Sequence, residues 1–200
     1  FVIENVKGLL DEKFKDVFEN FLAQLDEIGY DVKYRLLDAV DYEVPQNRER
    51  VFLIGFRHDL GIDYHFPQPS INKPLTLKDV IGNITAPPIP CKEDEVMTDS
   101  NSYYNGKFGS HYYRGNRRRS WDKPSFTIHA TGYNIPLHPS SPCMIYNAHE
   151  DWSFIKGKYC EYRRLTVREC ASIQTFPDHF EIDCPNIIDA YKMIGNAVPV

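Results

Sequence analysis

The segment from residue 11 to residue 29 carries apolar side chains at the spacing of an α-helix. They recur at steps of three and four residues, at Phe14, Val17, Phe18, Phe21, Leu22, Leu25 and Ile28. Steps of this size place all of them on one side of a helix. Gly29 follows the last apolar position and suits the carboxyl cap. The segment therefore predicts an amphipathic helix with one apolar face.

Strand-like segments flank this helix on both sides. Residues 1–5 form a short apolar run that ends in polar residues, as expected for a buried parallel strand whose carboxyl end opens onto a site. No turn or helix cap precedes this strand, so we expect the chain to be part of something longer. Residues 31–39 and 50–56 are two further strand-like runs, joined by a turn that contains Pro45. The order strand, helix, strand, strand predicts an α/β fold.

Residues 58–162 differ in composition from the segment before them. Prolines stand at positions 67, 69, 74, 87, 88 and 90, and the one short helix candidate covers residues 75–81, with Thr76 as its cap. This composition predicts an irregular, strand-poor lobe. The expected domain boundaries therefore divide the chain into 1–57, 58–162 and 163–200.

Regular structure is expected to return after residue 162. Thr166 and Glu169 have the spacing of a capping box, in which the Thr hydroxyl and the Glu carboxylate satisfy each other's free backbone donors at a helix start. This pattern predicts a helix from there to about residue 175. A second helix is expected over residues 187–193, before a turn at Gly195–Pro199.

The composition is that of a globular protein. With 42% hydrophobic and 26% charged residues, the 200 residues can bury one core, or one core and a small lobe. No apolar run approaches the roughly 20 residues that span a bilayer, and the apolar start lacks the basic flank of a signal peptide. We therefore expect a cytoplasmic protein with no membrane partner. The five cysteines include no C-x-x-C pair, so the sequence indicates neither a disulfide framework nor a metal site.

Charge is distributed unevenly along the chain. The net charge of -5 argues weakly against nucleic-acid binding, but association follows the local field. Between residues 101 and 135 a single acid, Asp122, stands against six basic residues, namely Lys107, Arg114, Arg117, Arg118, Arg119 and Lys123. The acids are concentrated in residues 11–31 and 93–99. Residues 101–135 are therefore the candidate nucleic-acid surface.

Four short motifs follow one another along the chain. They are Glu4-Asn5-Val6, Gln46-Asn47-Arg48-Glu49-Arg50, Arg164-Leu165-Thr166-Val167-Arg168-Glu169 with Gln174-Thr175-Phe176-Pro177-Asp178, and Gly195-Asn196-Ala197-Val198-Pro199. In this order and at this spacing they resemble the last four conserved blocks of the DNA cytosine-5 methyltransferase family. The resemblance extends over the whole chain. It implies a partial Rossmann-like methyltransferase domain with an inserted target-recognition domain in the irregular, strand-poor lobe.

The resemblance implies a chemistry for three residues. In this family the target cytosine is swung out of double-stranded DNA, because its reacting atom is inaccessible within the stack. A cysteine thiolate adds to C6, and C5 then attacks the methyl group of S-adenosyl-L-methionine. By resemblance, a protonated Glu4 faces N3 and the exocyclic amine while Arg50 faces O2, where donors stabilise the developing charge. Arg48 is expected to hold Arg50 or a nearby phosphate.

Other interpretations of these residues stay open. Glu4 has the position of a carboxylate that caps the turn after a strand, and Arg48 and Arg50 have the pattern of a solvated strand edge. Asn196 resembles the family position beside the methionine part of the cofactor, with Gly195 allowing close backbone approach. The alternative for this pair is a helix-terminating turn without a ligand.

The basic segment of the lobe is the candidate contact with DNA. Arginine forks read guanine in the major groove, and others neutralise phosphates. The segment with Arg114, Arg117, Arg118 and Arg119 looks closest to the recognition region of family members that methylate within GGCC. Where a further arginine is expected after Gly132, this chain has Tyr133, which we include among the DNA-binding candidates. A solvated face is the alternative.

The family's glycine-rich cofactor loop and Pro-Cys nucleophile lie upstream of Glu-Asn-Val, and neither is present in this sequence. Cys91 follows Pro90, but it stands out of family order and is not expected to be a nucleophile. We therefore expect an amino-terminal half, on the same chain or on a separate subunit, as a partner. The alternatives are a non-catalytic sequence-specific DNA-binding module and an α/β domain with no nucleic-acid role.

Overall fold

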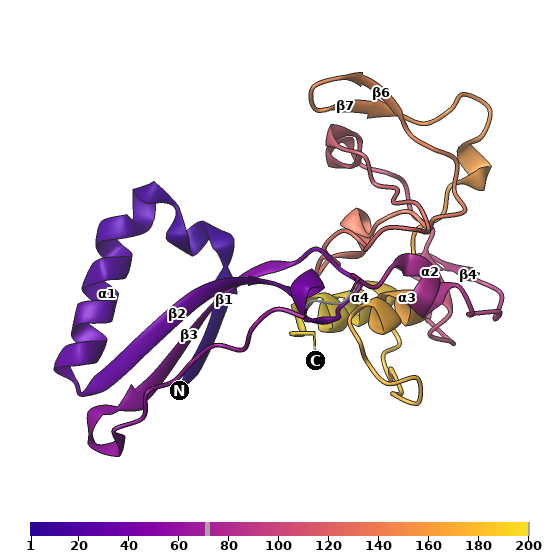
Figure 1. The fold of residues 1–200 in the computed structure, drawn as a ribbon. Helices are drawn as coiled ribbons and strands as arrows, with labels where there is room; N and C mark the ends of the chain where they lie inside the picture. The colour runs from indigo at the N-terminus through magenta and orange to yellow at the C-terminus, as the bar shows by residue number, and fades with distance from the viewer. Residues whose placement is uncertain (71–72, 200) are drawn as a thin grey trace. The chain divides into compact units, whose positions relative to one another are not determined.

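The computed structural model describes residues 1–70 and 73–199 (Figure 1). The chain forms two compact units, the first made of residues 1–42 and 48–72 and the second of residues 43–47 and 73–200. These limits follow compactness and differ from the boundaries expected at residues 57 and 162. The division into functional domains therefore stays a prediction. None of the described helices is both long and apolar enough to cross a lipid bilayer.

The first unit contains the strands and the helix predicted from its sequence. Two short 3-10 turns precede the helix, which begins at Lys15 rather than at Asp11. The elements are β1 (Val2–Val6), α1 (Lys15–Glu27), β2 (Tyr30–Asp38) and β3 (Glu49–Arg57). The strands form a three-stranded antiparallel sheet in the order β1-β3-β2. The predicted order strand, helix, strand, strand is confirmed.

Strand β1 differs from its prediction as a buried parallel strand. It runs antiparallel to β3, which is its only sheet neighbour among the described residues. Val2 is 67% exposed, and Val6 is exposed as well. The prediction is wrong for the described residues because burial depends on cover on both faces and both edges, which the apolar sequence alone does not reveal.

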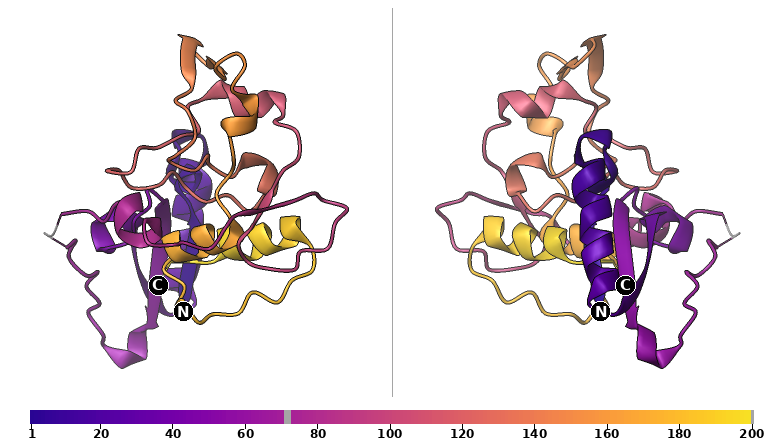
Figure 2. Two further views of the ribbon diagram at one scale, coloured as in Figure 1. Left: turned by 90° about the vertical axis from the view of Figure 1, so that its right-hand side faces the viewer. Right: turned by 90° about the vertical axis from the view of Figure 1, so that its left-hand side faces the viewer.

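Helix α1 covers one face of the sheet, and Figure 2 shows it running alongside the strands. Phe18 packs with Val51 and Leu53 in a small core. Only part of the predicted apolar stripe is used in this way, since Val17 and Ile28 are exposed. The face of the sheet that carries Glu4 lies opposite to this core.

The described part of the second unit contains three α-helices, and their starts agree with the sequence. They are α2 (Leu77–Ile81), α3 (Val167–Ile173) and α4 (Ile187–Asn196). Thr166 and Glu169 form the predicted capping box of α3, with the Glu169 backbone N donating to Thr166 Oγ1 at 3.1 Å. Helix α4 continues through Gly195 and Asn196. The turn predicted from Gly195 therefore begins two residues later than expected.

The lobe between these helices is poor in strands, as predicted. In the described residues it contains β4 (Ile89–Cys91) paired with β5 (Ser102–Tyr104), and β6 (Ile145–Ala148) paired with β7 (Asp151–Ser153). Apart from α2, the rest consists of 3-10 turns and irregular segments, part of which pack on α3 and α4. Cys91 is buried in this core, and burial raises the pKa of its thiol. This argues against a nucleophilic thiolate at Cys91.

Candidate active site and nucleic-acid interface

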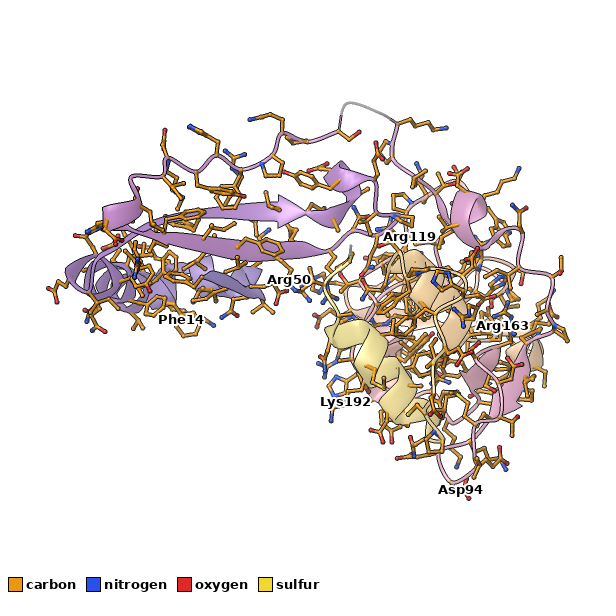
Figure 3. All side chains as sticks on the ribbon, turned by 90° about the horizontal axis from the view of Figure 1, so that it is seen from below. Phe14, Arg50, Asp94, Arg119, Arg163 and Lys192 are labelled. Atoms are coloured by element: carbon orange, nitrogen blue, oxygen red, sulfur yellow. The ribbon has the colours of Figure 1, made fainter. Side chains whose placement is uncertain are left out.

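Strand pairing places Glu4 and Arg50 on the same face of the sheet. Val6 pairs with Arg50, and Glu4 pairs with Phe52. Because side chains alternate along a strand, Glu4 and Arg50 are diagonal neighbours, a spacing that long side chains can bridge. Figure 3 shows Arg50 at the end of the sheet where β3 begins.

The two side chains meet in an ion pair. Arg50 Nε lies 2.7 Å from Glu4 Oε1. The N–H is not aligned for a hydrogen bond, so Glu4 Oε1 is buried without a hydrogen-bond donor. Arg50 Nη1 donates to the Glu49 carbonyl at 2.8 Å, which fixes the orientation of the guanidinium. The pair therefore presents an acceptor that lacks a donor beside a fixed positive charge.

Arg48 lies close to this pair and is buried. Its backbone N donates to Asp38 Oδ1 at 2.8 Å, which ties the start of β3 to the end of β2. Burial, reinforced by Arg50 and opposed by Glu4, lowers the pKa of Arg48 to about 10. The guanidinium stays charged at neutral pH. The structure thus brings together Glu4, Arg48 and Arg50, the three residues predicted to act in catalysis.

Gln46, in the same motif, is part of the second unit and serves a different purpose. Its Oε1 accepts from the backbone N of Ile128 at 2.9 Å, and its Nε2 donates to Gln174 Oε1 at 3.0 Å. Gln174 Nε2 in turn donates to the Ile194 carbonyl at 2.8 Å. Sequence reasoning assigned no role to Gln46 or Gln174. The only indication of this contact in the sequence was that each of the two motifs contains a glutamine.

Gly195 and Asn196, the predicted cofactor contacts, have unlike surroundings. A Cβ on Gly195 would lie 2.4 Å from the backbone of His129. The close packing of α4 on the lobe is thus enough to explain why this position is a glycine. Asn196 is exposed, and its amide fits a contact with a polar ligand. The cofactor role of both residues stays a prediction.

Two arginines of the basic segment donate within the lobe. Arg118 Nε and Nη2 donate to the Pro139 carbonyl at 3.1 and 2.8 Å, and Nε also donates to the Ser141 carbonyl at 3.2 Å. Arg117 Nε and Nη2 donate to the carbonyls of Tyr112 and His111 at 3.2 and 2.9 Å. These guanidiniums hold the irregular backbone together, because carbonyls outside regular structure need donors. A DNA contact by either stays a prediction.

The remaining DNA-binding candidates are differently placed. Arg119 lies over the ring of Phe126, 4.1 Å from its centroid, and its Nη2 donates to Asn47 Oδ1 at 3.5 Å. Arg114 is exposed and makes no side-chain hydrogen bond or ion pair in the described part of the chain. Tyr133 is exposed, and its hydroxyl donates to Glu93 at 2.7 Å. Among the arginines of the basic segment, Arg114 is therefore the one most available to a ligand.

Arg164 belongs to the third motif, and the structure gives it a specific structural task. It is 1% exposed, and its guanidinium donates to the carbonyls of Tyr104, Gly106 and Lys107 at 3.0, 3.0 and 3.3 Å. It also lies 4.1 Å from the ring centroid of Phe108. A buried arginine with carbonyl and aromatic partners organises the segment that leads to Arg114.

The whole chain matches one protein family. A family model described as C-5 cytosine-specific DNA methylase matches residues 1–200.

The chain belongs to the C-5 cytosine-specific DNA methylase family.

This C-5 cytosine-specific DNA methylase chain is similar to named bacterial and archaeal methyltransferases. It is 42% identical over 205 residues to Type II methyltransferase M.MthTI of Methanothermobacter thermautotrophicus, covering 100% of this chain and 62% of the relative. It is 42% identical over 207 residues to Type II methyltransferase M.NgoPII of Neisseria gonorrhoeae, covering 100% and 61%. The chain thus spans about 60% of the length of these relatives, and the resemblance inferred from its motifs is confirmed.

Solved structures agree on the fold. The Entamoeba histolytica methyltransferase EhMeth superposes with a TM-score of 0.61 at 18% identity, covering 99% of this chain and 57% of that structure. The expected partial methyltransferase fold of the α/β class is therefore confirmed.

Proposed function

We propose that this chain is the carboxy-terminal portion of a DNA cytosine-5 methyltransferase, which methylates C5 of a cytosine flipped out of duplex DNA. The observation that carries the proposal is the pair of Glu4 and Arg50. Glu4 Oε1 is buried without a hydrogen-bond donor, 2.7 Å from Arg50 Nε. One edge of cytosine offers an amine donor and a ring nitrogen, and the neighbouring O2 is an acceptor. A carboxyl group beside a guanidinium complements that edge.

The pair also suits the charge that develops during the reaction. When a thiolate adds to C6, negative charge builds at N3 and O2, so groups that donate to these atoms lower the barrier. In this proposal the entering base replaces Arg50 as the partner of Glu4, and Glu4 takes up a proton to donate to N3. Arg50 keeps donors for O2, since a guanidinium has five N–H groups and Nη1 alone is held by Glu49. Arg48 adds a second charge nearby.

The reaction needs a methyl donor and a cysteine nucleophile, and this chain supplies little for either. S-adenosylmethionine, when bound, supplies the methyl group, and Asn196 is this chain's candidate contact for it. The cysteine nucleophile and the glycine-rich cofactor loop come, in this proposal, from an amino-terminal portion that the chain does not span. Residues 1–57 and 163–200 then belong to the catalytic domain, and residues 58–162 recognise the DNA. The exposed Arg114 is the leading phosphate or base contact.

The decisive experiment is Glu4→Gln in the protein completed with its amino-terminal portion. The substituted side chain keeps an amide donor but cannot be protonated and deprotonated. Turnover with duplex DNA and S-adenosylmethionine should therefore fall about 100-fold, because proton transfer by a positioned side chain contributes about 100-fold or more. DNA affinity should change by less than about twofold. Glu12→Gln, on an exposed turn, is the matched control and should leave turnover intact. Turnover of Glu4→Gln equal to that of the parent protein would reject the assigned role.

A further inference from the structure

A recess of about 550 Å³ lies in the second unit between the segments 104–112 and 131–134. Its aromatic lining comes from Tyr104, Tyr112 and Tyr133, and Lys107 and His111 add basic side chains to the lining. The recess shares no residue with the pair of Glu4 and Arg50. Its volume falls within the range of about 300–1,000 Å³ that is typical of small-ligand sites.

The walls of the recess are held in place by the protein itself. Arg164 donates to the carbonyls of Tyr104 and Lys107 at 3.0 and 3.3 Å, and its guanidinium lies 4.8 Å from the Tyr104 ring centroid. On the opposite wall, a Cβ on Gly132 would lie 2.7 Å from the side chain of Ile188. Gly132 therefore packs directly on α4. A recess fixed in this way loses little conformational freedom when a ligand enters.

Tyr133 offers an aromatic surface at the mouth of the recess. It is 43% exposed, its ring meets Tyr104 edge-on at 5.3 Å, and its hydroxyl donates to Glu93 at 2.7 Å. These two contacts fix the orientation of the ring while leaving part of it exposed. A flat ligand can stack on such a surface at little entropic cost, because the side chain is already oriented.

Lys107 places a positive charge in the lining of the recess, whereas the Glu93 carboxylate lies beside the Tyr133 hydroxyl. Lys107 and His111 are exposed, and neither side chain has an ion-pair partner among residues 1–70 and 73–199. Both belong to the segment from residue 101 to residue 135, where six basic residues stand against Asp122 alone. A ligand with a flat apolar ring and an attached negative charge matches both features. A nucleotide has this chemistry.

We infer that this recess binds one unstacked nucleotide of the DNA substrate, with its base against Tyr133 and its phosphate near Lys107 and His111. The inference rests on the proposed function, because that function brings DNA to the second unit. It assigns a second base-binding position, made by other residues than those that hold the target cytosine.

The test compares Tyr133→Ala with Tyr133→Phe in the completed protein, bound to a duplex that carries GGCC. Tyr133→Phe keeps the ring and loses only the bond to Glu93, so its affinity should stay within about twofold of the parent. Tyr133→Ala removes the stacking surface and should weaken binding about tenfold or more. Equal affinities for both variants, whether high or low, would overturn the inference.

A second measurement examines the phosphate. Lys107→Gln should reduce the slope of log affinity against log salt concentration by about 1, as expected for the loss of one phosphate contact. Lys15→Gln, exposed on α1, should leave the slope unchanged. An unchanged slope in Lys107→Gln would contradict the phosphate position. These binding measurements do not depend on turnover, so they remain interpretable if Glu4→Gln shows the catalytic proposal to be wrong.

Discussion

The side-chain amide of Gln46 donates to that of Gln174 at 3.0 Å, across 128 positions of the chain. The contact is buried, and each amide makes one further bond to the backbone, Gln46 with Ile128 and Gln174 with Ile194. The second motif is thereby joined to the third and, through α4, to the fourth. Three segments that are far apart in sequence form one hydrogen-bonded structure.

Loss of these linked amide contacts should lower the stability of the fold considerably. Gln174→Met keeps the volume and flexibility of the side chain but leaves the Gln46 amide and the Ile194 carbonyl without their partner. We expect the free energy of unfolding to fall by about 2–4 kcal/mol, since each buried group left unsatisfied costs about 1–3 kcal/mol. Urea unfolding measures the change. Gln24→Met, on the exposed side of α1, should change it by less than about 0.5 kcal/mol.

At Gly195, packing and helix propensity have opposite effects on the stability of an alanine variant. Within a helix Ala is intrinsically favoured over Gly by about 1 kcal/mol. At Gly195 the added Cβ would overlap the backbone of His129, which cannot rotate away. Overpacking should win, with Gly195→Ala lowering the free energy of unfolding by about 1–3 kcal/mol. In Gly109→Ala nothing lies within 4 Å of the new Cβ, so a comparable loss there would show that the contact with His129 is not the cause.

His138 predicts a dependence of stability on acid. Burial, with a smaller contribution from Arg163, lowers the pKa of His138 to about 4, although Glu169 at 3.5 Å opposes the shift. Arg163 already neutralises Glu169 through two hydrogen bonds of 2.9 and 2.8 Å, so the lowered value is consistent with the geometry. The unfolded chain takes up this proton near pH 6.5 and the folded chain near pH 4. Stability from this group is therefore complete above about pH 6.5 and is lost as the pH falls towards 4.

The loss should reach about 3 kcal/mol at most, from the separation of the two pKa values. Urea unfolding between pH 7 and pH 4 measures it. His138→Gln should flatten the pH dependence in this window, whereas His149→Gln, at an exposed position, should not. A parent protein whose stability does not vary between pH 6.5 and pH 4.5 would contradict this prediction.

Thr175 predicts a stabilising substitution. It follows Gln174 at the end of α3 with φ of 64°, a left-handed conformation that a β-branched residue rarely adopts. Thr175→Gly removes this strain, and we expect a net gain of about 0.5–1 kcal/mol after counting the greater freedom of glycine in the unfolded chain and the lost hydrogen bond from Thr175 Oγ1 to the Gln174 carbonyl. Ser172→Gly, inside α3, should instead lose about 1 kcal/mol. Thermal unfolding of the two variants should therefore shift in opposite directions.

Local patterns in the sequence were sufficient for the helices and for the family. The spacing of Phe18 and its neighbours predicted α1, and Thr166 with Glu169 predicted the start of α3. These features depend on backbone geometry over one or two turns, so nearby residues decide them. The exact start of α1 was missed because the 3-10 turn Glu12–Phe14, directly before the helix, contains the first residue of the apolar stripe.

The amino-acid sequence alone determined that this chain carries motifs of the C-5 cytosine-specific DNA methylase family in order, and that its lobe is irregular. Only the tertiary structure decided which groups meet. Strand register brings Glu4 to Arg50, and the folding of the lobe brings Arg118 to the carbonyls of Pro139 and Ser141. The physical reason is that a charged side chain either makes contacts within its own fold or remains available to a ligand. Which of the two holds depends on partners that are distant in sequence, and a run of arginines does not identify those partners.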